Sequence, residues 1–210
     1  RTMMVDTQVR PSDVTKFPII DAMLSVPREE FVPASLREAA YVGENIALGA
    51  NRVMLEPRTL AKMLDALSIE PDHVVLDLGC GLGYSTAILA KMAEFVVAVE
   101  DDADNATQAQ NILSESGVDN AAVMQGALRD GAAKSAPYDI VMIQGAVEVV
   151  PDAILAQLRD GGRIACIFAE GALGVVRIGR KIDGAVNWRY AFNAGAPVLS
   201  GFQKEAAFSL

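Results

Sequence analysis

The chain has 210 residues, a formal net charge of −9 and a pI near 4.6. This length fits one α/β domain, and the acidic balance argues against nucleic-acid partners, because non-specific nucleic-acid binding needs a cationic surface. No apolar run approaches the roughly 18 residues of a membrane span, and no signal peptide is expected. The two cysteines, Cys80 and Cys166, lie in apolar contexts. They are expected to be buried thiols in a reducing cytoplasm, and with no apolar run of spanning length no membrane partner is expected.

Residues 1–56 are predicted to form a mostly helical lid that prolines interrupt, and residues 57–210 the main domain, the two making one compact unit. The prolines are Pro11, Pro18, Pro27 and Pro33. Pro57 suits the first turn of a helix. An apolar stripe follows it at helical spacing, made of Leu60, Met63, Leu64 and Leu67.

Residues 74–83 are the most informative segment, because a run of Val and Leu ends in Asp77 and turns through three glycines. The glycines are Gly79, Gly81 and Gly83. The apolar run predicts a central strand from His73 to Leu78, covered on both faces. Glycines let the backbone turn tightly and approach a ligand, and the helix from Tyr84 to about Met92 aims its N-terminus at the same place. This arrangement predicts a cofactor site, although a turn kept only for packing is the alternative.

A second acid stands about 20 residues further on, where the apolar run 95–99 ends in Glu100. A carboxylate in this place of a strand–helix–strand unit holds a ribose diol. The dinucleotide fingerprint would need a glycine where Tyr84 stands. Asp-x-Gly-x-Gly-x-Gly instead resembles the first motif of the methyltransferases that use S-adenosylmethionine. The resemblance implies that Glu100 takes the ribose hydroxyls, that Asp77 lies near the methionine end, and that the turn packs against the cofactor. The predicted contacts of the turn are Gly79, Cys80, Gly81, Gly83 and Tyr84.

Strand and helix patterns alternate through the rest of the chain. The expected elements are a strand ending at 100, a helix 102–116 closed by Gly117, strands 121–124 and 138–143, a helix from Pro151 to about 158, a turn 159–162, a strand 163–168, and hairpin strands 174–179 and 188–192 that turn at Asp183-Gly184. Alternating elements imply a parallel sheet with helices on both faces. With the methyltransferase resemblance, the prediction is an α/β, Rossmann-like, mostly parallel seven-stranded sheet with a C-terminal antiparallel hairpin and an N-terminal helical extension.

A more specific motif precedes the first strand of this sheet. The chain reads Ser-Val-Pro-Arg-Glu-Glu-Phe-Val-Pro over residues 25–33, followed by Ala-Tyr at 40–41. This resembles the protein-L-isoaspartate O-methyltransferases, over about residues 20–170 and weakly near 197–199. The resemblance implies methyl transfer from S-adenosylmethionine to the α-carboxyl of an isoaspartyl residue in a damaged protein or peptide, with S-adenosylhomocysteine as product. The methyl ester then closes to a succinimide, which is the repair step.

The substrate-facing loops depart from the family pattern. Leu55 stands at the position of a family serine and Glu56 at that of a glutamine. Ala127 replaces an aspartate that follows the third strand, where a cofactor contact is expected, and Gln144 replaces a threonine. A leucine cannot donate a hydrogen bond to a carboxylate, so no catalytic residue is identified. Two alternatives stay open: a methyltransferase for a different acceptor, and a catalytically impaired member with a binding or regulatory role.

Other chemistries find little support in the sequence. His73, the single histidine, is expected to be a strand-edge residue, and no Cys/His spacing suggests a metal site. No G-x-S-x-G elbow of a serine hydrolase occurs. Cys80 has no neighbour in sequence that would activate it as a nucleophile. The oligomeric state is not predicted.

Overall fold

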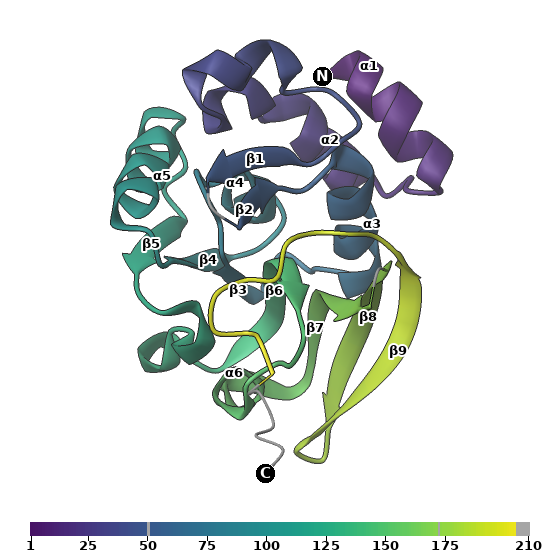
Figure 1. The fold of residues 1–210 in the computed structure, drawn as a ribbon, viewed down its shortest axis with the longest axis vertical. Coiled ribbons are helices and arrows are strands. Elements are labelled where there is room, and N and C mark those ends of the chain that lie inside the picture. The colour runs from purple at the N-terminus through teal and green to yellow at the C-terminus, as the bar shows by residue number, and fades with distance from the viewer. Residues whose placement is uncertain (50, 172, 205–210) are drawn as a thin grey trace.

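The computed structural model describes residues 1–49, 51–171 and 173–204. Within these residues, seven strands form one sheet and two further strands form a small separate hairpin. Figure 1 shows the N-terminal elements, in purple and blue, gathered at one end of the large sheet. The hairpin lies on the same side as these elements, and the yellow C-terminal segment passes across β6 (Figure 1), where Val198 bridges Ala146.

The large sheet has the predicted mostly parallel, Rossmann-like arrangement. Its strands are β3 (Val74–Leu78), β4 (Phe95–Glu100), β5 (Ala121–Gln125), β6 (Tyr138–Val147), β7 (Leu158–Glu170), β8 (Leu173–Ile182) and β9 (Ala185–Asn193). They lie in the order β5-β4-β3-β6-β7-β8-β9, and β8 alone runs in the opposite direction, so that it pairs antiparallel with β7 and with β9. The chain order reverses at β3, between β4 and β6. Open α/β sheets bind ligands at such a switch point, beyond the carboxyl ends of the strands.

The strand β7 begins earlier than the predicted residue 163. Leu158 already pairs with Tyr138, and the ladder resumes where Arg163 pairs with Ile140. The predicted turn 159–162 is therefore an irregularity inside the strand, at which Gly161 takes a φ of +81°. The strands β5, β6, β8 and β9 extend the predicted ranges by one to four residues, whereas β3 starts one residue later than predicted and β4 ends at the predicted residue 100.

The principal helices of the main domain follow the predicted pattern. They are α3 (Pro57–Leu67), α4 (Tyr84–Ala90), α5 (Ala103–Glu115) and α6 (Asp152–Gln157). Short 3₁₀ turns lie at Leu128–Asp130 and Ala133–Ser135. Asp102 caps α5 by accepting a hydrogen bond from the backbone N of Asn105 at 2.9 Å, which explains why an acid precedes this helix.

The N-terminal segment is helical only over its first part. It contains α1 (Thr2–Met4), a π-helical turn (Val5–Val9), α2 (Phe17–Ser25) and 3₁₀ turns at Arg10–Ser12, Arg28–Phe31 and Ala34–Ala39. The segment is mostly helical, but it ends in two strands that were not predicted: β1 (Ile46–Gly49) and β2 (Arg52–Met54) form the antiparallel hairpin. Positive φ angles at Gly49 and Asn51 let the chain reverse there. The boundary at residue 56 stays a prediction, and residues 205–210 of the predicted domain lie outside the described residues.

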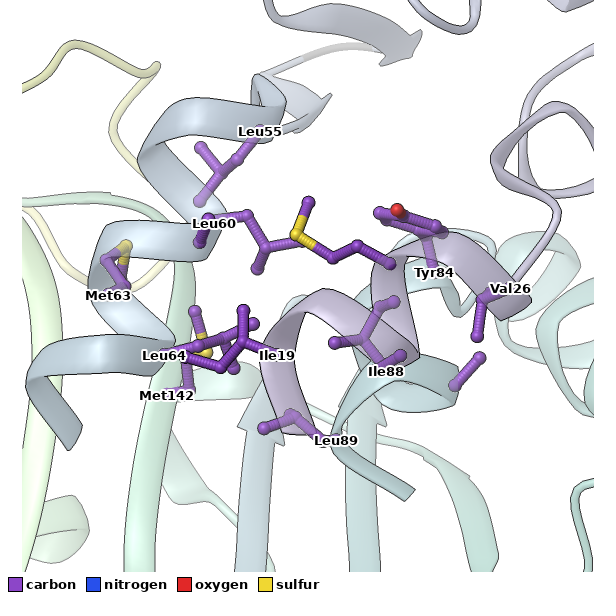
Figure 2. Packing of buried hydrophobic residues seen from close by; sticks show 14 of the residues in the cluster. Ile19, Val26, Leu55, Leu60, Met63, Leu64, Tyr84, Ile88, Leu89 and Met142 are labelled. Carbon is purple, nitrogen blue, oxygen red and sulfur yellow. The ribbon is translucent and has the colours of Figure 1, made fainter. Parts of the chain in front are cut away.

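Two apolar clusters cover the two faces of the large sheet. One contains alternate strand residues such as Val75 and Met142 together with residues of α2, α3 and α4. Figure 2 shows this cluster, in which Ile19 of α2 and Leu64 of α3 lie beside Met142, and Ile88 of α4 lies further along the same cluster. The other cluster lies on the opposite face beneath α6. Among the described residues, no helix has the length and apolar character needed to cross a bilayer.

Candidate functional site

The two acids predicted from the sequence lie on neighbouring strands near the carboxyl end of the sheet. Strands β3 and β4 pair in parallel, with Leu78 opposite Val99, so the turn after β3 lies next to Glu100. The backbone N of Gly79 donates to the carbonyl of Val99 at 2.8 Å and ties the turn to β4. Gly79, Gly81 and Gly83 have φ angles of +77°, +56° and +97°. L side chains rarely adopt such angles, which explains the three glycines.

Glu100 is fully buried, and both of its carboxylate oxygens are hydrogen-bonded. Oε2 accepts from the backbone N of Gly81 at 2.8 Å, and Oε1 accepts from the backbone N of Asp102 at 3.2 Å. Arg52 of the small hairpin donates to Oε1 from Nη2 at 2.8 Å and from Nε at 3.2 Å, and Nη2 also contacts Asp101. Burial raises the pKa of the Glu100 carboxyl to about 7, against the opposing effect of Arg52.

Asp77 is the centre of a second buried network. The hydroxyls of Ser85 and Thr86, both in the first turn of α4, donate to its Oδ2 at 2.7 Å, and Nε2 of Gln144 donates to its Oδ1 at 2.7 Å. Burial raises the pKa of this carboxyl, and the three donors oppose the shift. Gln144 therefore has a visible role: its amide reaches across from β6 and fixes the acid of β3.

The arginine of the 25–33 motif holds separate parts of the lid together and packs against Tyr84 of the sheet domain. Arg28 is fully buried and donates to the carbonyls of Ala40 at 2.7 Å and Leu55 at 2.8 Å. Its guanidinium lies 4.8 Å from the centre of the Tyr84 ring, and the Phe31 ring lies 5.8 Å from the same ring. Tyr84 thus directs its ring into the lid, so any contact of Tyr84 with a cofactor stays a prediction.

Leu55 and Glu56 both have structural partners. Leu55 is only 2% exposed, and its side chain points toward Leu60 in the apolar cluster (Figure 2). The carboxylate of Glu56 accepts a hydrogen bond from the hydroxyl of Thr59 at 2.7 Å, at the start of α3. Position 55, where the resemblance predicts a serine, therefore presents an apolar side chain to the core.

The remaining predicted site residues lie around the turn or at its border. The thiol of Cys80 is buried, and burial raises its pKa well above the ordinary value, with the nearby Asp77 and Glu100 adding to the shift. A thiol kept protonated in this way is a poor nucleophile. Ala127 is exposed just after β5 and carries no polar group toward Glu100. His73 accepts from the backbone N of Glu70 at 3.0 Å, in the turn before β3.

Sequence reasoning missed several residues that contact the turn or its acids, some of them from distant segments. These are Leu48 and Arg52 of the hairpin, Ser85 and Thr86 of α4, and Leu199 of the C-terminal segment. The Gly-Ala-Asn sequence at 49–51 is a turn signal that could have suggested the hairpin. Nothing local in the sequence links Arg52 to an acid so far along the chain.

Comparisons with known proteins agree with this architecture. The family model described as Protein-L-isoaspartate(D-aspartate) O-methyltransferase matches residues 3–193. A protein-L-isoaspartate O-methyltransferase of Koribacter versatilis is 33% identical over 184 residues, which covers 88% of this chain and 83% of that protein. One from Methylorubrum extorquens is 32% identical over 182 residues, covering 86% of this chain and 79% of that protein.

Solved structures show the same fold. A protein-L-isoaspartate O-methyltransferase superposes with a TM-score of 0.81 at 22% identity, covering 91% of this chain and 63% of that longer chain. A Plasmodium falciparum structure described as a protein of this kind, in complex with S-adenosyl-L-homocysteine, gives 0.81 at 17% identity, covering 93% of this chain and 96% of that one. With the match to the family model over residues 3–193, the chain belongs to the protein-L-isoaspartate(D-aspartate) O-methyltransferase family.

Proposed function

We propose that this chain transfers a methyl group from S-adenosylmethionine to the α-carboxyl group of an isoaspartyl residue in a damaged protein or peptide. The observation that carries the proposal is the buried carboxylate of Glu100, which is hydrogen-bonded to the glycine turn of β3 at the switch point of the sheet. The family membership of residues 3–193 supports the reaction class. S-adenosylhomocysteine would be the product.

The residues at the turn fit the chemistry of this cofactor. A carboxylate at the end of β4 is the acceptor that a ribose diol requires, and the Gly81 N–H already orients it. Backbone without Cβ atoms at Gly79, Gly81 and Gly83 allows close approach. Asp77, fixed by its three donors, supplies negative charge at the neighbouring strand end, where the cationic methionine portion is expected.

The reaction needs little acid–base help from the chain. S-adenosylmethionine supplies an electrophilic methyl group when it is bound. The acceptor is a carboxylate with an ordinary pKa near 4, which is already ionised at neutral pH. The residues of the chain then have to align the acceptor, hold its charge and exclude water. The lid is the segment available to exclude water: Arg28 holds its parts together through Ala40 and Leu55 and packs on Tyr84 of the main domain.

Holding the acceptor is the step at which this chain differs from its family. Leu55 provides no donor, and its side chain is buried. A carboxylate that lacks one hydrogen-bond donor loses about 1–3 kcal/mol. If this loss is felt in the transition state, the rate falls about tenfold to more than a hundredfold. We therefore expect slow methyl transfer compared with members that keep the serine.

The test is methyl transfer from labelled S-adenosylmethionine to an isoaspartyl peptide and to its aspartyl twin, with S-adenosylhomocysteine binding measured on the same sample. Selective methylation of the isoaspartyl peptide is the expected result. Binding of S-adenosylhomocysteine without methylation of either peptide would contradict the proposed acceptor and keep the cofactor. Absence of binding would contradict the cofactor as well.

A further inference from the structure

The hairpin β1–β2 places a cation on the carboxylate that the cofactor would use. Arg52 is 7% exposed and donates twice to Oε1 of Glu100, as well as to Asp101. Its Nη1 lies 3.0 Å from where a Cβ on Gly79 would be. The guanidinium therefore lies between the glycine turn and the acid, which is where a ribose diol bound to Glu100 has to lie. The geometry points to Arg52 as an internal competitor of the cofactor, so that the hairpin must lift before the cofactor binds; this inference rests on the proposed function.

Two leucines complete the cover over the turn. Cδ1 of Leu48, from the same hairpin, lies 2.5 Å from where a Cβ on Gly81 would be. Leu199 of the C-terminal segment lies 3.3 Å from the corresponding point on Gly79 and 2.5 Å from that on Gly145. The space that the missing Cβ atoms of these glycines leave open is therefore filled by other side chains of this chain.

The space left at the turn is too small for any cofactor. A cavity of about 10 Å³ remains there, with Leu48, Gly79 and Cys80 in its wall, which is room for about one water molecule. An open hollow of about 510 Å³ lies beside it, bordered by Leu48, Arg52 and Asp102. Leu48 borders both spaces. Moving Leu48 and Arg52 would join them into a pocket within the range of about 300–1,000 Å³ that is usual for small-molecule sites.

The hairpin is built so that it can move without disturbing the large sheet. Its two strands pair with each other and, among the described residues, form a sheet separate from the seven-stranded one. Ala47 pairs with Val53 and Gly49 with Arg52, so Leu48 is an extra residue that forms a bulge. A bulge redirects side chains, and here it lets Leu48 and Arg52 reach the same turn.

The base of the hairpin is the fixed end. Asn45 donates to the carbonyl of Gly195 at 2.8 Å and accepts from the backbone N of Glu56 at 2.9 Å. Ile46 and Met54 are buried in the apolar cluster that also contains residues of α2, α3 and α4. Moving Leu48 and Arg52 away from the turn about this base breaks their contacts and leaves every backbone ladder of the large sheet intact.

The closed hairpin lowers the apparent affinity for the cofactor. When only a fraction of molecules is open, the apparent Kd rises by the inverse of that fraction. The contacts to be broken include two charge-assisted hydrogen bonds on a buried carboxylate. Removing the guanidinium should therefore tighten binding by roughly tenfold to a hundredfold.

The experiment measures S-adenosylhomocysteine binding by calorimetry for wild type, Arg52→Gln and Leu48→Ala. We expect Arg52→Gln to bind at least about tenfold tighter, and Leu48→Ala to bind severalfold tighter. Arg10→Gln is the matched control, because Arg10 pairs with Asp6 on the exposed face of the lid, and its affinity should equal that of wild type. Leu48→Ala leaves the Arg52–Glu100 pair intact, so it tests the inference even if loss of the guanidinium prevents folding.

Rapid mixing gives a second readout. If opening precedes binding, the observed binding rate for wild type should level off as the S-adenosylhomocysteine concentration increases, and this limiting rate should be higher in Leu48→Ala.

Unchanged or weaker binding by both variants would overturn the inference. Methylation of the isoaspartyl peptide, measured in parallel, distinguishes the two proposals. If the isoaspartyl peptide is methylated but the variants bind S-adenosylhomocysteine as tightly as wild type does, only the competitor role of Arg52 is overturned. If the variants bind more tightly but the peptide is not methylated, only the proposed acceptor is overturned. Absence of binding in every protein overturns both.

Discussion

Gln144 donates a hydrogen bond from Nε2 to Oδ1 of Asp77 at 2.7 Å, although the two residues are far apart in the sequence. The pair connects β6 to β3 at the switch point of the sheet, and Asp77 is fully buried. Gln144, at the position where the resemblance predicts a threonine, therefore serves the carboxylate at the predicted methionine end. Removing the Gln144 amide would leave the buried Oδ1 of Asp77 without its hydrogen-bond donor.

Gln144→Ala is expected to lower the free energy of unfolding by about 1–3 kcal/mol, because Oδ1 of Asp77 loses its partner in a buried site. Urea denaturation at neutral pH measures the change. Gln108→Ala is the control, since Gln108 lies on the exposed face of α5. Equal stability of the Gln144 variant and wild type would mean that water replaces the amide.

Asp139 should make the free energy of unfolding depend on pH. Burial alone would raise the pKa of this carboxyl, but the backbone N–H of Val74 at 2.9 Å and the contact with Arg159 outweigh it, so the pKa is lowered. Because the pKa is lower in the folded state, the ionised carboxyl stabilises the fold at pH values above the unfolded-state pKa, near 3.8. This stabilisation is lost as the pH falls through the folded-state pKa. Asp139→Asn should thus be less stable than wild type at pH 7, by roughly 1–3 kcal/mol.

The difference between Asp139→Asn and wild type should shrink once the pH falls below about 4. Urea denaturation across this range tests the sign. Asp119→Asn, at an exposed acid, is the control and should follow wild type at every pH. A difference that stays constant with pH would show that the Asp139 effect is steric and not linked to ionisation.

Glu100 can be tested most clearly once its internal partner is gone. In the Arg52→Gln background, the additional change Glu100→Gln should weaken S-adenosylhomocysteine binding at least tenfold, because charge-assisted bonds to the diol are each worth about 1.5–3 kcal/mol. Calorimetry compares the double variant with Arg52→Gln. An unchanged affinity would contradict the assignment of Glu100 to the ribose.

The strand ends were predictable because the residues that define them are adjacent in the sequence. Runs of Val and Leu that end in Asp77 and Glu100 define two neighbouring parallel strands, and the glycines between them define the turn. The cover over the turn was not predictable in this way. The hairpin strands are short, and the pairing of Arg52 with Glu100 joins residues 48 positions apart, so neither leaves a periodic pattern.

The role of position 55 shows a further limit of the sequence. Comparison with the family pattern identifies Leu55 as a lost donor, but only the structure shows the side chain packed in the core beside Leu60 (Figure 2). The backbone carbonyl of the same residue accepts from Arg28, which sequence spacing cannot reveal. One position therefore combines an expected catalytic loss with a gain in packing.

Leu55→Ser should separate these two contributions. Removing the buried side chain should lower the free energy of unfolding by about 2–5 kcal/mol, as for other large-to-small core substitutions. If the hydroxyl supplies the missing donor, the rate of isoaspartyl methylation per folded molecule should rise about tenfold or more. Leu55→Ala is the matched control, because it creates a similar cavity without a donor, and it should lose stability with no gain in rate. Labelled methyl transfer at a temperature well below both unfolding midpoints provides the comparison. A serine variant that is no faster than the alanine variant would mean that position 55 does not contact the acceptor, and that the acceptor carboxylate is held by other groups of the chain.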